Sequence, residues 1–275
     1  MAGGINVADL AGHVKDSYSF HFPWGHWEIP ELLQTFGISK YVLVELGAAA
    51  LMFAIFIPLA KRIHGGKQLK GRFWNMMEVF LVYMKDEVIV PSIGSKELAA
   101  PYIPYLWTLF FFVLFCNLGG ILPWMGSPTG SVVVTGVLAV ITLAVVLVTG
   151  MKHHGVVGFW KGMVPHIEGK VGGVELSKVL GPFLFVLEVF SFFVKHVTLC
   201  IRLMANMFGG HLMLAIFAAF IPMSAWAIYV WVPVTICAVG ASIAVDFLEL
   251  FVAFLQAYIF TFLTSVYIGM SIHQH

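Results

Sequence analysis

Apolar residues along this chain gather in long runs that are separated by shorter polar segments. Three of these runs, at 41–60, 102–122 and 131–150, are about 20 residues long, which is the length a helix needs to cross the ~30 Å hydrocarbon core of a membrane. Each run therefore predicts one transmembrane helix. The link 123–130 is short and rich in Pro and Gly, so the runs beside it are expected to form a helical hairpin over 102–150.

Two further apolar runs, at 181–222 and 233–272, are about twice as long as a single span. A helix rises about 1.5 Å per residue, so an unbroken helix over either run would be about 60 Å long. Each run is therefore either one steeply tilted helix or two short spans. Pro222 and Pro233 flank the clearest turn, which predicts an antiparallel hairpin of long helices over 181–272.

The segment between the first two spans, 61–100, has a different pattern. Its first part, 61–72, contains five Lys and Arg residues and no acid, which is typical of a cytoplasmic loop. The remainder is less apolar and carries both charges, which favours an amphipathic helix lying on the membrane. The lysines of 151–180 predict a second cytoplasmic loop. The amino-terminal segment 1–40 is then expected outside, and the carboxyl terminus in the cytoplasm.

The composition agrees with this pattern. Hydrophobic residues make up 60% of the chain and charged residues 11%, against about 25% charged residues in a soluble domain. Disordered, collagen-like and nucleic-acid-binding classes are excluded. The three cysteines lie in apolar runs without metal-binding spacing, so no metal site or cofactor is expected. The predicted fold class is an all-α polytopic membrane protein, 1–275 forming a single membrane domain of five transmembrane helices and one membrane-lying amphipathic helix.

The C-terminal hairpin also carries ionisable residues where they are unfavourable. A charged side chain at the centre of a membrane helix costs about 2.5–3.5 kcal/mol on insertion scales, so such residues face protein or water and mark ion paths. The ionisable residues of the hairpin are Glu188, Lys195, His196, Arg202, His211, Asp246 and Glu249. The hairpin is therefore the candidate functional region.

Polar residues of the first hairpin helix follow one face. Glu188, Lys195 and Arg202 are seven residues apart, and Ser191 and Asn206 fall close to the same stripe. For Lys195 both a structural and a functional role remain open. His196 is expected only to pack.

The second hairpin helix carries Glu249 and Gln256, also seven residues apart. With the turn midway between the two prolines, Arg202 lies opposite a point between them. His211 then lies one to two turns from Glu249, which makes this histidine a candidate proton relay. Arg202 is the last Lys or Arg of the chain, and its guanidinium stays protonated, so it can hold a carboxylate but not relay a proton easily.

The stretch from Arg202 through Asn206 to His211, with the pattern RLxxNMxxGH, resembles subunit a of the F-type ATP synthase membrane sector. The likeness covers most of 30–272 and is strongest in 181–270. The supporting segments are Asn117-Leu118 with Leu122-Pro123, Pro182-Phe183 before Glu188, and Gln256 to Ile268. The resemblance implies a subunit without catalytic residues that translocates protons against a rotating ring of c subunits and couples this flow to ATP synthesis.

The resemblance also implies residue roles. Arg202 would be the essential arginine that faces the ring carboxylate and separates two aqueous half-channels. The residues implied for the outer half-channel are Asn206, His211, Glu249 and Gln256, and those for the cytoplasmic half-channel are Glu188 and Ser191.

Two positions depart from the pattern of many bacterial relatives. In those relatives the acid stands at the position of His211 and the histidine at that of Glu249, whereas here they are exchanged, as in the mitochondrial arrangement. Some relatives also carry an acid at the position of Gly120. Either no relay group stands there in this chain, or Asp246 supplies it.

The partners that the resemblance implies are the c-subunit ring, the b subunits of the peripheral stalk, the F1 sector through the complex, and membrane lipid, without nucleic acid. A bacterial inner membrane is the expected location. A secondary transporter remains an alternative, although no inverted repeat is recognisable. A sodium-translocating variant of the same subunit is the other, since the ring largely determines the coupling ion.

Overall fold

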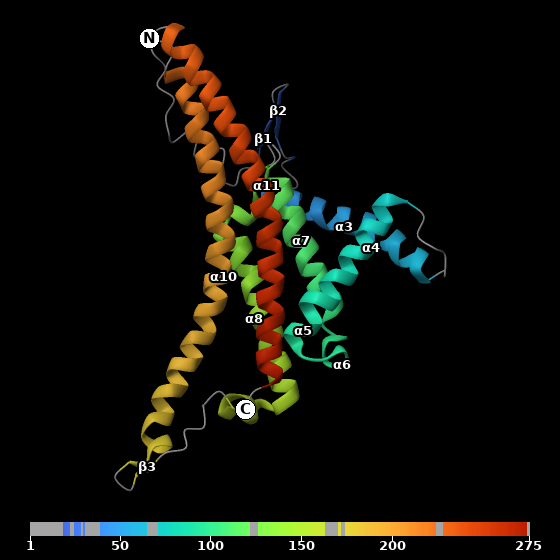
Figure 1. Ribbon diagram of the computed structural model, residues 1–275, viewed down its shortest axis with the longest axis vertical. Coiled ribbons are helices and arrows are strands. Elements are labelled where there is room, and N and C mark those ends of the chain that lie inside the picture. Colours follow the sequence, from blue (N-terminus) through green and yellow to red (C-terminus); the bar gives the residue numbers. More distant parts are fainter. Residues whose placement is uncertain are drawn as a thin grey trace. The chain divides into compact units, whose positions relative to one another are not determined.

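A computed structural model describes residues 19–22, 25–28, 30, 39–64, 71–121, 126–162, 170–171, 174–223 and 228–273. Five of its helices are long and apolar enough to cross a membrane (Figure 1). They are α3 (Lys40–His64), α7 (Ile103–Ile121), α8 (Val132–His154), α10 (Leu176–Met223) and α11 (Ile228–Ile272). The predicted helical membrane architecture with five spans is confirmed.

Each of the two long C-terminal runs forms one continuous helix. The helix α10 has 48 residues and α11 has 45, so the interpretation as two short spans in each run is wrong. The predicted start of the second helix is also wrong, because α11 begins at Ile228 and contains Pro233. Pro233 is the sixth residue of α11, so its missing N–H leaves one carbonyl group of the first turn without its helical hydrogen bond. The tilt of both helices stays a prediction.

The stretch predicted as an amphipathic helix is helical with short breaks. It consists of α4 (Arg72–Tyr83), a π-helical segment (Met84–Ile89), α5 (Val90–Ile93) and α6 (Lys96–Ala99). The apolar side chains of Met76 and Val79 on α4 are exposed, as expected of a helix that contacts lipid. Its position on the membrane stays a prediction.

Smaller elements complete the described chain. Besides the 3₁₀-helix Pro128–Gly130 and α9 (Val156–Gly162), two short antiparallel hairpins occur, which the apolar pattern did not predict. Their strands are β1 (Ser19–Phe22), β2 (Gly25–Glu28), β3 (Lys170–Val171) and β4 (Val174–Glu175). The rest of the predicted outer segment up to residue 38, apart from residue 30, and the parts 65–70, 122–125 and 163–169 of the predicted loops lie outside the described residues.

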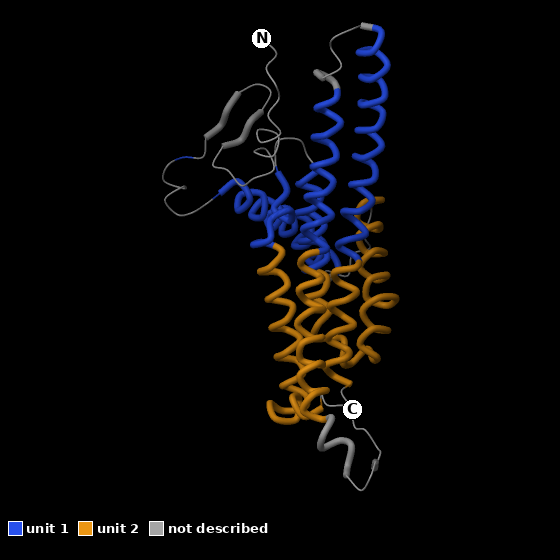
Figure 2. The backbone as a smooth tube through the Cα atoms, turned by 90° about the vertical axis from the view of Figure 1, so that its left-hand side faces the viewer, with its two compact units in different colours: residues 1–70, 109–134, 202–258 blue, residues 71–108, 135–201, 259–275 orange. Residues whose placement is uncertain are grey.

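The chain divides into two compact units (Figure 2). Unit 1 comprises residues 1–70, 109–134 and 202–258, and unit 2 comprises 71–108, 135–201 and 259–275. Inside unit 1, aromatic contacts join three helices: the ring centroids of Phe56 and Phe111 are 4.6 Å apart, and those of Phe110 and Phe254 are 5.9 Å apart. The core of unit 2 consists of Ile89, Ile93, Ala99, Ile103, Leu106, Val146, Ile268 and Ile272. The single membrane domain over 1–275 stays a prediction.

Candidate functional site

In unit 1 the helices α10 and α11 are joined by polar side chains from the predicted set. Asn206 Nδ2 donates a hydrogen bond of 3.0 Å to Gln256 Oε1. Gln256 is only 1% exposed whereas Asn206 is exposed, so this bond is partly buried. The structure therefore brings together two residues that the resemblance assigned to one half-channel.

The side chain of Glu249 lies directly against the backbone of Gly210. A Cβ atom added to Gly210 would overlap the carboxylate of Glu249 and come within 2.9 Å of its Cγ. Only a glycine at position 210 leaves room for the carboxyl group at this depth. The predicted register placed Glu249 one to two turns from His211, and the structure packs Glu249 against the residue adjacent to His211.

Both carboxylate oxygens of Glu249 lack a hydrogen-bond partner among the described residues, although this side chain is only 5% exposed. His211 is half-buried, and its buried Nε2 atom also has no partner there. Burying a polar group without a hydrogen bond is unfavourable, and such groups in proteins are usually satisfied by water. These two titratable side chains are therefore candidates for hydrogen bonding to water.

Further unsatisfied polar atoms lie on the same face of α11. Glu249, Ala253 and Gln256 share one face of this helix, because they are four and three residues apart. Asn117 of α7 donates a hydrogen bond of 3.2 Å from its Nδ2 atom to the backbone oxygen of Ala253. The Oδ1 atom of Asn117 and the Nε2 atom of Gln256 are buried without a partner among the described residues. Such a group of unsatisfied atoms is typical of a hydrated path.

Asn117 is a site residue that the sequence pattern missed. It belongs to a segment that only supports the family resemblance. Its position in an apolar helix, far from the hairpin in the sequence, gave no reason to expect a role. Its contact with Ala253 fixes α11 between Glu249 and Gln256.

Arg202 lies four residues before Asn206 and shares its face of α10. The side chain is half-buried and forms no hydrogen bond or ion pair within the part of the chain that the structure describes. An arginine remains charged in proteins, so this guanidinium is available to an anionic group from outside the described chain. Asp246 is exposed and lies one turn before Glu249 on α11.

The packing around Gly120 explains the absence of an acid there. A Cβ atom at this position would come within 2.7 Å of the Cβ and Oγ atoms of Ser127. Ser127 is buried, and its hydroxyl forms a hydrogen bond of 3.1 Å with the hydroxyl of Thr129. The Ser127 side chain occupies the space that an acid would need.

In unit 2 the residues implied for the cytoplasmic half-channel, Glu188 and Ser191, are half-buried on α10, as is Lys195. His196 is only 3% exposed, and its ring lies 5.0 Å from that of Phe192 and 5.1 Å from that of Tyr267.

The ring contacts agree with the expectation that His196 only packs. Its two nitrogen atoms differ, however, in their hydrogen bonding. The Nδ1 atom faces the backbone oxygen of Phe192 at 2.9 Å, which requires Nδ1 to donate. The Nε2 atom then carries a free lone pair, and it is buried without a partner among the described residues. Sequence spacing gave no signal for this, since burial of His196 depends on packing against Tyr267 of α11.

Comparison with known proteins gives the same family throughout. The family described as ATP synthase A chain matches residues 42–269, which include the hairpin residues above. ATP synthase subunit a of Myxococcus xanthus is 34% identical over 90% of this chain and 79% of its own length.

Two further bacterial relatives have the same name. ATP synthase subunit a of Rhodopseudomonas palustris is 34% identical over 91% of this chain and 97% of its own length. That of Pelodictyon phaeoclathratiforme is 33% identical over 94% of this chain and 74% of its own length. Together with the five apolar helices, these matches identify an integral membrane protein, and the chain belongs to the ATP synthase subunit a family.

Proposed function

We propose that this chain conducts protons through two aqueous half-channels against a rotating c-subunit ring and so couples proton flow to ATP synthesis. As a member of the ATP synthase subunit a family, it belongs to a complex with other subunits. The observation that carries the proposal is the buried carboxylate of Glu249, which has no hydrogen-bond partner among the described residues and packs against Gly210, the residue next to His211 in the chain. The same hairpin carries Arg202, which is unpaired within the described part of the chain.

The outer half-channel is formed by the polar residues of unit 1. Water that enters it hydrogen-bonds to the unsatisfied atoms of Gln256, Glu249 and His211, and Glu249 and His211 exchange protons with that water. Asn206 holds Gln256 in place through its hydrogen bond. Asp246, exposed one turn from Glu249, serves as a further relay.

Arg202 separates the two half-channels. A ring carboxylate must be neutral to face lipid, because a bare charge there is strongly unfavourable. Beside a guanidinium the ionised form is favoured, so the carboxylate gives up its proton near Arg202 and takes another one only after passing it. The membrane potential biases this cycle by about 2.3 kcal/mol per charge per 100 mV.

The cytoplasmic half-channel is formed by Glu188 and Ser191 in unit 2. The free Nε2 atom of His196 adds a hydrogen-bond acceptor to this part of α10. Lys195, next to it, supplies a positive charge that disfavours the entry of other cations.

The proposed partners are the c-subunit ring, the b subunits of a peripheral stalk, the F1 sector through the complex, and lipid. Much of the apolar surface of α10 and α11 supports this, because large side chains such as Phe190, Phe247 and Phe251 are exposed in the isolated chain. Because the chain belongs to a family of ATP synthase subunits, we set aside the alternative of a secondary transporter. For the alternative of a sodium-translocating variant of the same subunit, the difference lies in the c-subunit ring. The proposed partners and residue roles are then the same.

Exchange of the two titratable residues of unit 1 tests the proposed proton path. In vesicles containing the assembled complex, His211→Ala and Glu249→Ala should each slow ATP-driven proton pumping, because each removes a proton carrier. The double exchange, His211→Glu with Glu249→His, should retain much more pumping than either exchange alone, since Glu249 packs against Gly210, the residue next to His211. Pumping is measured with a pH-sensitive dye.

The control for this exchange is Glu78→Ala, which removes an exposed acid of α4 and should pump normally. A double exchange no more active than the single exchanges would contradict the pair. Near-normal pumping by every variant would show that neither residue carries protons.

The proposed topology places the amino terminus outside and the carboxyl terminus in the cytoplasm of a bacterial inner membrane. In a Cys237→Ala background, which removes the exposed cysteine, Pro30→Cys should react with an impermeant thiol reagent added outside. Lys61→Cys, at the basic end of α3, should react only after the membrane is opened. Labelling of Lys61→Cys from outside in intact cells would reverse the topology.

A further inference from the structure

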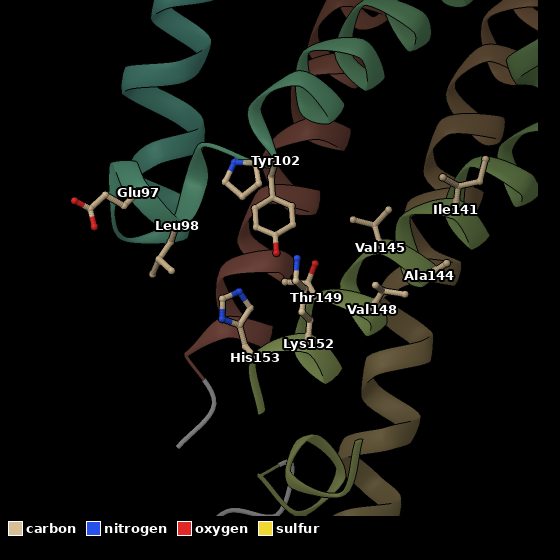
Figure 3. A pocket seen from close by; sticks show the side chains of 11 residues that line it. Glu97, Leu98, Tyr102, Ile141, Ala144, Val145, Val148, Thr149, Lys152 and His153 are labelled. Carbon is tan, nitrogen blue, oxygen red and sulfur yellow. The ribbon is translucent and has the colours of Figure 1, made fainter. Parts of the chain in front are cut away.

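A groove of about 600 Å³ in unit 2 lies apart from the residues assigned to the proton path (Figure 3). One wall is the face of α8 that carries Ile141, Ala144, Val145 and Val148, which recur at helical spacing. The opposite wall is the junction of α6 and α7, with Leu98, Pro101 and Tyr102. The groove is therefore apolar along a helix that is long enough to cross the membrane.

One end of the groove is polar. Thr149, Lys152 and His153 line it, and in Figure 3 the Tyr102 hydroxyl and the Lys152 amino group point toward each other. Glu97 also lines the groove, but its carboxylate points away from the cavity in this view. The charge facing the groove at this end is thus positive.

Two of the three basic side chains at this end have no partner within the described part of the chain. The last turn of α8 carries Lys152, His153 and His154. His154 is occupied, because its Nε2 atom lies 2.9 Å from the backbone oxygen of Ile272. Lys152 and His153 are exposed and form no hydrogen bond or ion pair within the described part of the chain.

We propose that this groove binds one anionic phospholipid. An acyl chain lies along the apolar face from Ile141 to Val148, and the phosphate lies at the end formed by Lys152, His153 and the Tyr102 hydroxyl. Basic pockets between membrane helices on the cytoplasmic side are suited to anionic headgroups, and the loop that follows α8 is the basic segment predicted on that side. A soluble anion would leave the apolar part of the groove unused.

Native mass spectrometry of the purified complex, delipidated in detergent, tests this site. Phosphatidylglycerol and phosphatidylcholine with identical acyl chains are added separately, and we expect preferential retention of phosphatidylglycerol. Lys152→Gln should lower its retention by about fivefold, since each cation near an anionic headgroup contributes roughly this factor. Lys161→Gln, which removes an exposed lysine of α9 outside the groove, should have no effect.

A second variant distinguishes binding of the lipid inside the groove from attraction of the lipid to surface charge alone. Ala144→Phe fills the apolar wall and should lower the retention of both lipids. Unchanged retention in Ala144→Phe, or equal retention of both lipids by the unmodified complex, would overturn the proposal. A photoreactive residue at Val148 should cross-link to lipid, and cross-linking to another subunit instead would assign the groove to a protein partner.

Discussion

Replacing Arg202 with alanine is expected to abolish ATP-driven proton pumping while the complex remains assembled. The guanidinium forms no hydrogen bond or ion pair within the described part of the chain, so its loss should change the free energy of unfolding by no more than about 0.5 kcal/mol. Its charge, by contrast, is the proposed barrier between the half-channels. Without it a protonated ring carboxylate can pass, and passive proton leak across the vesicle membrane should rise.

Arg202→Lys should fail or nearly fail although it keeps a positive charge. Lysine lacks the planar fork that holds a carboxylate, and it loses its proton more readily when it is desolvated. The measurement is proton flux across vesicles with and without ATP, with Lys161→Ala as a control for loss of a cation elsewhere. Normal pumping by Arg202→Ala would contradict the proposed mechanism and favour a purely structural subunit.

Replacing Gly210 with alanine is expected to reduce proton flux by up to about 100-fold, which is the effect that a misplacement of about 1 Å can have on a reacting group. The added Cβ would overlap the Glu249 carboxylate, so that side chain must move from its place against Gly210. Gly210→Val should act more strongly, because its methyl groups extend further into the same space. The effect should fall on proton flux and leave assembly intact, since the end of a glutamate side chain can shift without moving the backbone.

The matched control for Gly210 is Gly240→Ala. Gly240 lies on α11 of the same hairpin, but among the described residues no atom beyond its chain neighbours and the adjacent helix backbone lies within 4 Å of its added Cβ. Proton flux in this variant should stay normal. Equal loss in both variants would mean that any side chain on the hairpin is harmful, and an active Gly210→Val would show that the position of Glu249 does not limit proton transfer.

The candidate site was largely visible in the sequence because charge in a membrane helix is rare. Arg202, His211 and Glu249 stand out from apolar neighbours, and the RLxxNMxxGH pattern links the first two of them to a known family. The contacts of Asn117 and His196 were not visible. Each depends on packing between segments far apart in the chain: α7 against α11 for Asn117, and α10 against α11 for His196.

The sequence by itself determined the five membrane helices, the helical hairpin with its polar face, and the family. Its apolar runs are long enough to require spans, and few charged residues are left to cover a soluble surface. Only the tertiary structure decided that Glu249 packs on Gly210, that Ser127 occupies the space beside Gly120, and that a groove opens beside α8. Helical periodicity fixes which face a residue occupies, but the atoms opposite that face depend on the register between helices, which side-chain packing sets.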